Sequence, residues 1–408
     1  MKALVLAGGL PQIVLINQLK QRGVTTILAD GNEHPLARPY ADLFYQVNIF
    51  DIEAVKKIAV DEGVDFLITC CADQVLLVVA QVSEMLGLPW YIDYKTAVRV
   101  SDKREMKRIF MENNIPTSRY VELAELDMEQ IKDLAYPLIV KPVDAYSSKG
   151  VRKALNVDEL KQYFAEAAQI SRNGGVIVEE FCQGEEISVD LYVEDGVAHV
   201  LCVSNSEKLK DEDRFIIFRG KYPAIADTAL LERIRYVAQQ IVDAFGLKNC
   251  PMLIQMISNG KDVSVLEFCA RTGGNMKYIL IQRVSGFDVI SAVIDLTMGV
   301  RPKVEIKPPQ HQYVVNDFIY CKPGVFDHLE GFDALVEEGV LAEYHCLRPK
   351  GMQVRGVASS SDRVAGFTVV ADSLEEFNQK HRAVVERARI MDENGVDIMR
   401  HDLLPDLQ

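Results

Sequence analysis

The sequence predicts an α/β domain at the N-terminus followed by an α+β region, and three observations lead to this prediction. Over residues 1–100, short apolar runs alternate with helical patterns, which is typical of a doubly wound parallel sheet. From residue 101 onward, strand patterns occur in neighbouring pairs joined by short turns, which indicates antiparallel pairing. The length of 408 residues exceeds what one hydrophobic core organises, so several domains are expected.

Residues 1–100 contain strand and helix patterns in alternation. The expected strands are Lys2–Ala7, Thr25–Ala29 and Phe66–Cys70, and the expected helices are Ile13–Arg22, Ile52–Glu62 and Val75–Leu86. Ligands of such sheets bind at the carboxyl ends of strands, where Gly8-Gly9 and Asp73 stand. The glycine pair lacks the full G-x-G-x-x-G pattern, which argues against dinucleotide binding. Asp73 is expected either to cap the next helix or to contact a substrate.

Residues 101–300 mix helices with paired strands. The expected helices are one that follows Lys103 and runs through Met111, Val157–Ala168 and Ala229–Phe245. The expected strands are Pro137–Lys141, Gly175–Phe181, Glu186–Val193, Val197–Val203, Met252–Ile257 and Asp262–Phe268. The Asn259-Gly260 pair between the last two strands is a strong hairpin signal, because both residues tolerate the backbone of a tight turn.

The tail begins with Pro302, Pro308 and Pro309, which are typical of a linker. Strands are expected over Gln312–Tyr320 and Ala365–Ala371, followed by a helix over Leu374–Glu393. These changes of pattern predict an α/β domain at residues 1–100, a domain of two α+β subdomains at 101–300, and a lid-like C-terminal α+β domain at 301–408.

Composition excludes several classes of protein. The formal net charge of −14 argues against nucleic acid as the main partner, because a phosphate backbone requires a basic face. The eight Cys form no C-x-x-C pair and no zinc spacing, so buried thiols in a reducing compartment are expected. No apolar run reaches the ~20 residues of a membrane span, and the first residues are not typical of a signal peptide. We expect a soluble cytoplasmic protein.

Two segments carry residue types suited to anion and metal chemistry. After the apolar strand that begins at Ser264, Glu267 and Arg271 precede Gly273-Gly274. A carboxylate holds a hard metal ion, a guanidinium binds an anion, and glycines let the backbone approach a ligand. Lys141 ends another strand before a proline, where it either meets a phosphate or is solvated.

Two further segments complete the pattern. The loop with Ser147, Ser148 and Gly150 has the small residues that let backbone N–H groups fold over phosphate oxygens. The strand that ends at Glu179-Glu180-Phe181 is followed by Glu186, a carboxylate suited to accepting hydrogen bonds from ribose hydroxyls; a hairpin with solvated acids is the alternative.

Together these segments resemble the ATP-grasp superfamily, whose members are mostly carboxylate–amine or carboxylate–thiol ligases. The resemblance covers essentially the whole chain in the same order, and the length and tail are most similar to bacterial L-amino acid ligases. It implies an ATP-grasp fold in which the first domain is the pre-ATP-grasp domain and the nucleotide lies between the two subdomains of residues 101–300. It also implies ATP and Mg²⁺, or Mn²⁺, as cofactors.

The resemblance assigns a role to each candidate residue. For the nucleotide, it implies that Lys103 and Lys141 bind the α- and β-phosphates and that the loop with Ser147, Ser148 and Gly150 covers the phosphates. It also implies that Glu179, Glu180 and Phe181 form the adenine hinge and that Glu186 binds the ribose. For the metal and the reaction, it implies that Glu267 and Gln255 occupy the metal positions and that Arg271 binds the acyl-phosphate. Arg271 and Lys141 are the implied catalytic residues.

Two residues depart from the family pattern. Gln255 stands where an acid is usual, and Cys269 stands where Asn is frequent. A Gln side chain ligates through its carbonyl oxygen without adding charge, and a thiol is a poor partner for Mg²⁺. The number of metal ions therefore stays open.

The resemblance implies an ATP-dependent ligase that joins a carboxylate, such as that of an amino acid, to an amine through an acyl-phosphate and releases ADP and phosphate. A thiol ligase or carboxylase of the same superfamily is one alternative, and a non-catalytic ATP-binding regulator, which Gln255 and Cys269 favour, is another. The expected partners are small carboxylate and amine substrates, without nucleic acid or membrane, and a homodimer is a reasonable expectation. Candidates for holding a substrate carboxylate are Lys208, Arg214, Arg219 and Lys221, for which a solvated basic loop is the alternative. The run Ala358 to Ser361, with Arg363, is a candidate for closing over the substrate.

Overall fold

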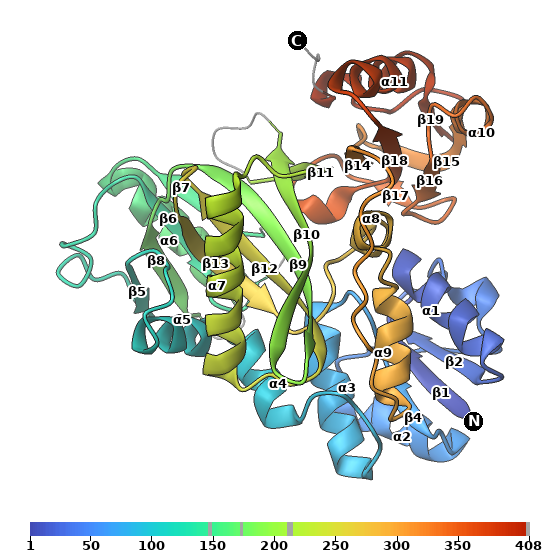
Figure 1. The fold of residues 1–408 in the computed structure, drawn as a ribbon, viewed down its shortest axis with the longest axis horizontal. Coiled ribbons are helices and arrows are strands. Elements are labelled where there is room, and N and C mark those ends of the chain that lie inside the picture. The colour runs from blue at the N-terminus through green and yellow to red at the C-terminus, as the bar shows by residue number, and fades with distance from the viewer. Residues whose placement is uncertain (146–148, 172–173, 210–214, 405–408) are drawn as a thin grey trace.

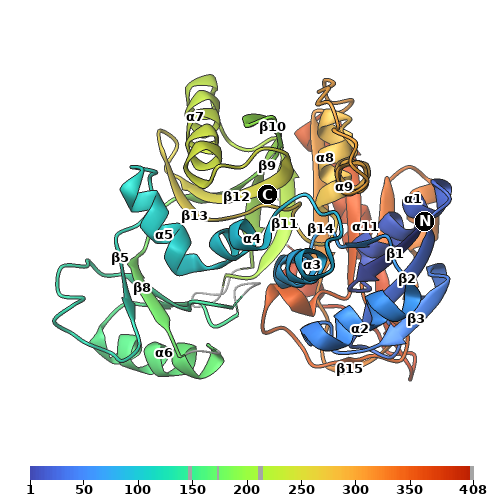
Figure 2. The same cartoon turned by 90° about the horizontal axis from the view of Figure 1, so that it is seen from below.

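The computed structural model describes residues 1–145, 149–171, 174–209 and 215–404 of the chain. In this part, a parallel N-terminal sheet, a small antiparallel sheet and a large antiparallel sheet are followed by a three-stranded sheet in the tail (Figure 1). Seen from below, the small sheet and the N-terminal sheet lie on opposite sides of the molecule (Figure 2). Among the described residues, no helix is long and apolar enough to cross a membrane.

The N-terminal sheet is parallel, with strand order β3-β2-β1-β4. Its elements are β1 (Lys2–Leu6), α1 (Leu10–Gln21), β2 (Thr25–Asp30), η1 (Arg38–Tyr40), β3 (Leu43–Gln46), α2 (Ile52–Glu62), β4 (Phe66–Ile68) and α3 (Asp73–Leu86). Because side chains alternate along a strand, Leu4 and Leu6 pack with α2 and α3, whereas Val5 packs with α1 on the other face. The predicted doubly wound sheet is confirmed.

The small sheet is antiparallel, with strand order β5-β8-β6-β7. It follows α4 (Tyr94–Ser101) and α5 (Lys103–Glu112), and its elements are β5 (Tyr120–Leu123), β6 (Leu138–Pro142), β7 (Arg152–Ala154), α6 (Val157–Ile170) and β8 (Val176–Glu180). Helix α6 packs on the sheet through Leu160, Phe164 and Ala167. The pairing of β6 with β8 brings Lys141 and Glu179, which are 38 residues apart in sequence, within contact distance.

The large sheet has the strand order β13-β12-β9-β10-β11-β14-β18-β16, and all neighbours are antiparallel. Its strands are β9 (Glu185–Glu194), β10 (Val197–Lys208), β11 (Ile217–Tyr222), β12 (Cys250–Ser258), β13 (Val263–Cys269), β14 (Tyr313–Ile319), β16 (Glu343–Cys346) and β18 (Ala365–Ala371). The last three lie beyond residue 300, so the tail extends a sheet that begins in the preceding segment.

Two helices pack on the large sheet, and a third connects it to the N-terminal sheet. Helix α7 (Thr228–Phe245) buries Ile234 and Ile241 against β9, β12 and β13, whereas α8 (Lys277–Ser285) buries Leu280 with residues of β10 and β14. Helix α9 (Val289–Thr297) then returns to the N-terminal sheet, where it packs against α1 (Figure 1). After leaving the N-terminal sheet and forming most of the large sheet, the chain thus returns to the N-terminal sheet through α9.

The tail adds a three-stranded sheet with order β17-β15-β19. Its further elements are β15 (Gly324–Glu330), α10 (Phe332–Glu337), β17 (Gln353–Val354), η2 (Ser360–Asp362), α11 (Leu374–Arg387), β19 (Arg389–Asp392) and η3 (His401–Leu403). The predicted helix Leu374–Glu393 is wrong at its end, because α11 stops at Arg387 and the next residues pair with β15, which buries Ile390. Tertiary pairing there overrides the helical pattern.

Candidate active site

A cavity of about 130 Å³ lies between the small sheet and the edge of the large sheet formed by β9, β12 and β13. The residues singled out from the sequence that line it are Lys103, Lys141, Glu179, Glu180, Phe181, Glu186, Gln255 and Glu267. They come from α5, β6, β8 and the residue after it, β9, β12 and β13, so the fold collects in one cavity residues that are spread over 165 positions of sequence.

Lys141 is buried rather than solvated, and it is tied to Glu179. Its Nζ donates to Oε1 of Glu179 at 2.5 Å, and the Nζ of Lys107 lies 2.7 Å from the other carboxylate oxygen, Oε2. Burial opposes ionisation of Glu179, but the two ammonium groups outweigh it and hold the pKa of Glu179 well below its usual range. The carboxylate thereby fixes the ammonium of Lys141 in the cavity wall.

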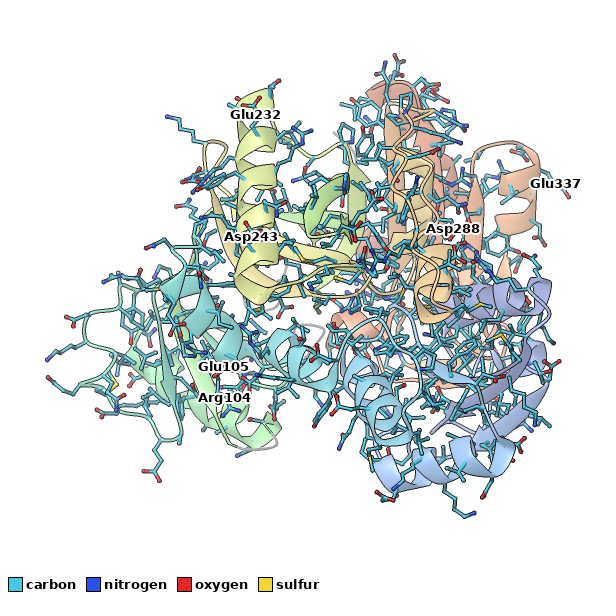
Figure 3. All side chains as sticks on the ribbon, turned by 60° about the horizontal axis from the view of Figure 1, so that its bottom comes forward. Arg104, Glu105, Glu232, Asp243, Asp288 and Glu337 are labelled. Atoms are coloured by element: carbon cyan, nitrogen blue, oxygen red, sulfur yellow. The ribbon has the colours of Figure 1, made fainter. Side chains whose placement is uncertain are left out.

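Lys107 is a site residue that the sequence analysis missed. It is 2 % exposed, and its Nζ also donates to Oγ1 of Thr117 at 2.6 Å and Oγ of Ser118 at 2.9 Å. On the same helix, Arg104 pairs with Asp102 and Glu122 and is partly exposed (Figure 3). The available signal was spacing, because Lys107 lies one turn after Lys103 and therefore on the same face of the helix.

The predicted adenine hinge lines the cavity, but its side chains are engaged elsewhere. The carboxylate of Glu180 accepts hydrogen bonds from Arg119 Nε at 3.0 Å and from the backbone N–H of Ala135 at 2.8 Å. The backbone N–H of Phe181 donates to the carbonyl of Pro137 at 3.0 Å. Contact between this segment and adenine stays a prediction.

Lys103 lies at the mouth of the cavity beside the predicted metal-binding carboxylate. Its Nζ is 3.0 Å from Oε2 of Glu267 and donates to the carbonyl of Ala145, also at 3.0 Å. Burial disfavours the ammonium, but Glu267 outweighs this effect and raises the pKa of Lys103. The lysine is therefore held as a cation beside Glu267.

Glu186 is buried, and both of its carboxylate oxygens are occupied. Oε2 lies 2.6 Å from Nζ of Lys208, and Oε1 accepts from Nε2 of Gln255 at 3.0 Å. Lys208, a candidate for holding a substrate, therefore lines this cavity beside Glu186. The expected contact of Glu186 with a ribose requires that it exchange at least one of these partners.

The remaining basic and loop candidates have different positions. The Arg219 guanidinium is buried and binds Asp317 at 2.6 and 2.8 Å, so it joins β11 to β14. Gly150 adopts a left-handed φ of +73°, and a Cβ there would lie 2.8 Å from Ile170. The predictions for Ser147, Ser148 and Arg214 lie outside the described residues, and Lys221 stacks near the rings of Tyr313 and Phe377.

A second cavity, of about 900 Å³, opens between the N-terminal sheet, the large sheet and the tail. It shares Lys103, Ala145, Gln255 and Glu267 with the smaller cavity. The two spaces therefore meet at the predicted phosphate and metal residues.

Arg271 lines this larger cavity and is paired with Asp73. The Nε of Arg271 donates to Oδ1 of Asp73 at 2.5 Å, and Nη1 donates to the carbonyl of Thr272 at 2.6 Å. Burial opposes ionisation of Asp73, but Arg271 outweighs this and lowers the pKa of Asp73. The expected capping role of Asp73 is wrong, because Ala72 is the N-cap and Asp73 is the first residue of α3.

The donor set at Glu267 fits one Mg²⁺ ion. Gln255 and Glu267 are directly opposite in the β12–β13 pair, and the amide nitrogen of Gln255 is used by Glu186, which leaves its carbonyl oxygen. Within the described part of the chain, no three His, Cys, Asp or Glu side chains gather as a metal site. Mg²⁺ needs only one or two protein oxygens when phosphates and water supply the rest. Burial raises the pKa of the Cys269 thiol, which disfavours it as a ligand.

The site consists of two adjoining cavities, and comparison with known proteins shows which family the central part of the chain resembles. Residues 134–278 match the model of the ATP-grasp domain family. The resemblance found in the sequence is confirmed over these residues, which are similar to the ATP-grasp domain.

Curated relatives match at low identity. The chain is 27% identical to carbamoyl-phosphate synthase from Methanobrevibacter smithii, over 42% of this chain and 47% of the relative. It is also 27% identical to formate-dependent phosphoribosylglycinamide formyltransferase from Sulfurisphaera tokodaii, over 60% of this chain and 64% of the relative. The chain thus spans about half of the first relative and just under two thirds of the second.

Solved structures match over almost the whole chain. The L-amino acid ligase from Bacillus licheniformis has a TM-score of 0.80 at 18% identity, covering 96% of this chain and 99% of that one. Phosphoribosylglycinamide synthetase from Anaerococcus prevotii has a TM-score of 0.75 at 20% identity, with the same coverage. These likenesses confirm the fold, including the C-terminal region.

Proposed function

We propose that the protein is an ATP-dependent ligase that joins a carboxylate to an amine, forming a C–N bond and releasing ADP and phosphate. The observation that carries this proposal is the junction of the two cavities at Lys103, Gln255 and Glu267. A nucleotide in the smaller cavity would present its terminal phosphate to a substrate in the larger one. The expected cofactors, ATP and Mg²⁺, agree with the similarity to the ATP-grasp domain, and solved relatives of the same fold include a biotin carboxylase domain with MgADP.

The charged residues of the smaller cavity would position the phosphates. Lys103 and Lys141 are each held by a carboxylate, so little conformational freedom is lost when a phosphate replaces or joins that contact. Glu267, with the carbonyl oxygen of Gln255, would hold Mg²⁺, which neutralises phosphate charge when bound. Because phosphoryl transfer needs little covalent chemistry from the protein, positioning and charge are what these residues contribute.

The residues of the larger cavity would act on the substrate. In the first step, a carboxylate oxygen forms a bond to the γ-phosphorus while the bond to ADP breaks. In the second, the amine nitrogen bonds to the carbonyl carbon, phosphate leaves, and the nitrogen loses a proton. Arg271 would bind the acyl-phosphate, a contact of a kind worth about 10²–10³ in rate. To do so, it must share or release Asp73.

Two alternatives make different predictions. A carboxylate–thiol ligase or carboxylase would use the same first cavity with another nucleophile. A non-catalytic regulator is favoured by one observation, the hydrogen bond that commits the amide nitrogen of Gln255 to Glu186. Such a regulator would bind ATP without consuming it.

The test is a screen of amino acid pairs with ATP and Mg²⁺, in which nucleotide products are separated and ligated products are weighed by mass spectrometry. We expect ADP and phosphate in equal amounts with a C–N product, and loss of turnover in Glu267→Gln. The matched control is Glu232→Gln, which changes an exposed acid on α7 (Figure 3) that lines neither cavity. Release of AMP would contradict the acyl-phosphate, and ATP binding without turnover for any pair would favour the regulator.

A further inference from the structure

Among the residues that the structure describes, five cationic side chains line the larger cavity, and they divide into two groups. Three have a carboxylate partner: Lys103 pairs with Glu267 at 3.0 Å, Arg271 with Asp73 at 2.5 Å, and Lys277 with Asp190 at 3.2 Å. The other two, Arg348 and Arg363, come from the tail and have no carboxylate within ion-pair distance among the described residues.

Arg363 is held firmly by neutral groups. Its Nη2 donates to the carbonyl of Ile217 at 2.9 Å, its Nε lies 3.3 Å from the hydroxyl of Tyr320, and its guanidinium carbon is 3.8 Å from the ring centre of Phe318. These contacts fix the plane of the guanidinium without neutralising its charge. They leave Nη1 without a protein partner among the described residues.

Arg348 is oriented by the same segment. Its Nε donates to the carbonyl of Arg363 at 2.9 Å, and its Nη2 donates to the carbonyl of Ser361. Burial lowers the pKa of Arg348, and the nearby acid Asp362 offsets this only in part. The carboxylate of Asp362 is engaged by the backbone N–H groups of Ala358 and Ser359, at 2.9 and 2.7 Å.

Two oriented guanidinium groups that have no carboxylate within ion-pair distance among the described residues are suited to binding an anion. A partly buried cation is costly unless it is paired, and a cleft lined by one sign of charge concentrates ligands of the other sign. Planar guanidinium donors match the oxygens of carboxylates and phosphates. Neither arginine lines the smaller cavity, so the site belongs to the substrate rather than to the predicted nucleotide.

We propose that Arg348 and Arg363 bind an acidic group, a carboxylate or a phosphate, on a substrate in the larger cavity, and that this group is not the carboxylate that is activated. The inference rests on the proposed ligase function, because activation must occur where the two cavities meet, at Lys103 and Glu267. An amino acid that serves as the amine carries such a second group in its own carboxylate, and a phosphorylated substrate carries it as a phosphate.

The experiment titrates the protein, saturated with Mg²⁺ and a non-hydrolysable ATP analogue, with inorganic phosphate and separately with acetate, and follows the heat of binding. We expect Arg348→Gln and Arg363→Gln each to weaken binding of the preferred anion about tenfold or more, since a charge-assisted hydrogen bond is lost. The matched control is Lys350→Gln. Lys350 lies two residues after Arg348, is exposed and pairs with Asp327, and it does not line the larger cavity. Preference for acetate indicates a carboxylate ligand, and preference for phosphate indicates a phosphorylated one.

Two results would overturn the inference: a wild-type protein that binds neither anion, or both variants binding as the wild type does. Because Arg363 also holds Ile217 and Tyr320, affinity for the ATP analogue serves as the folding check, and Arg348→Gln provides the second variant. Failure of the wild type to bind the ATP analogue would instead refute the proposed function. In that case the same titrations without the analogue still test the arginine pair.

Discussion

Lys107 provides the sharpest test of the reasoning about the site, because it is buried, charged and absent from the cavity wall. The substitution is Lys107→Met, which keeps the length of the side chain and removes the ammonium. It deletes contacts to Glu179 at 2.7 Å, Thr117 at 2.6 Å and Ser118 at 2.9 Å. We expect both the stability of this region and the affinity for ATP to fall.

The expected magnitude follows from the burial of the pair. Removing one partner of a buried ion pair typically costs about 3–5 kcal/mol, because the other charge is left without compensation. Glu179 keeps Lys141 as a partner, which places the expected loss near the lower limit, about 3 kcal/mol. With one cation left, Glu179 binds Lys141 more strongly, so that less of the lysine's charge is available to a phosphate.

The assay is hydrogen exchange of the backbone amides in α5 and β8, combined with titration of an ATP analogue. Local exchange is preferred to a global midpoint, since a chain with several sheets need not unfold in two states. Arg108→Met, one residue further along α5, is the control; Arg108 is exposed and pairs with Glu105 and Glu112, so little or no loss of stability is expected. Equal exchange and equal nucleotide affinity in the two variants would refute the reasoning.

Three further predictions concern the metal and substrate residues. Glu267→Gln should abolish Mg²⁺-dependent turnover while the circular dichroism spectrum stays that of the wild type; an unchanged kcat would show that Glu267 is not at the metal. Gln255→Glu should change the Mg²⁺ titration, by tighter binding or a second equivalent, and identical titration curves would place residue 255 away from the ion. Asp73→Asn should change how the stability of the protein depends on acidic pH. Because the pKa of Asp73 is lowered in the folded state, ionised Asp73 stabilises the wild type above the ordinary carboxyl pKa, and this stabilisation is lost as pH falls through the folded pKa. The variant has no carboxylate at residue 73 and therefore has no such stabilisation to lose. Thermal midpoints measured from neutral to acidic pH would follow this, and parallel curves would contradict it.

The sequence indicated which segments line the candidate site, but it did not indicate which side chains pair with one another there. Lys141 and Glu267 were found because each ends an apolar strand, where a charged side chain is unusual enough to notice. Lys107 was missed, since a lysine on an amphipathic helix normally lies in solvent, and only the packing of α5 against β8 buries it. The pairing of Arg271 with Asp73 was likewise invisible, because 198 residues separate them.

The order of strands, helices, glycines and charged residues was enough to indicate the ATP-grasp fold and most of the cavity wall, because local periodicity and strand-end chemistry are written into short stretches of chain. The tertiary structure alone decided how charge is distributed in that wall. It buried Lys107, gave both oxygens of Glu186 to Lys208 and Gln255, and placed Arg348 and Arg363 beyond ion-pair distance of every carboxylate in the described part of the chain. Such pairings depend on which distant segments meet, and their energies depend on burial, so no local pattern in the sequence contains them.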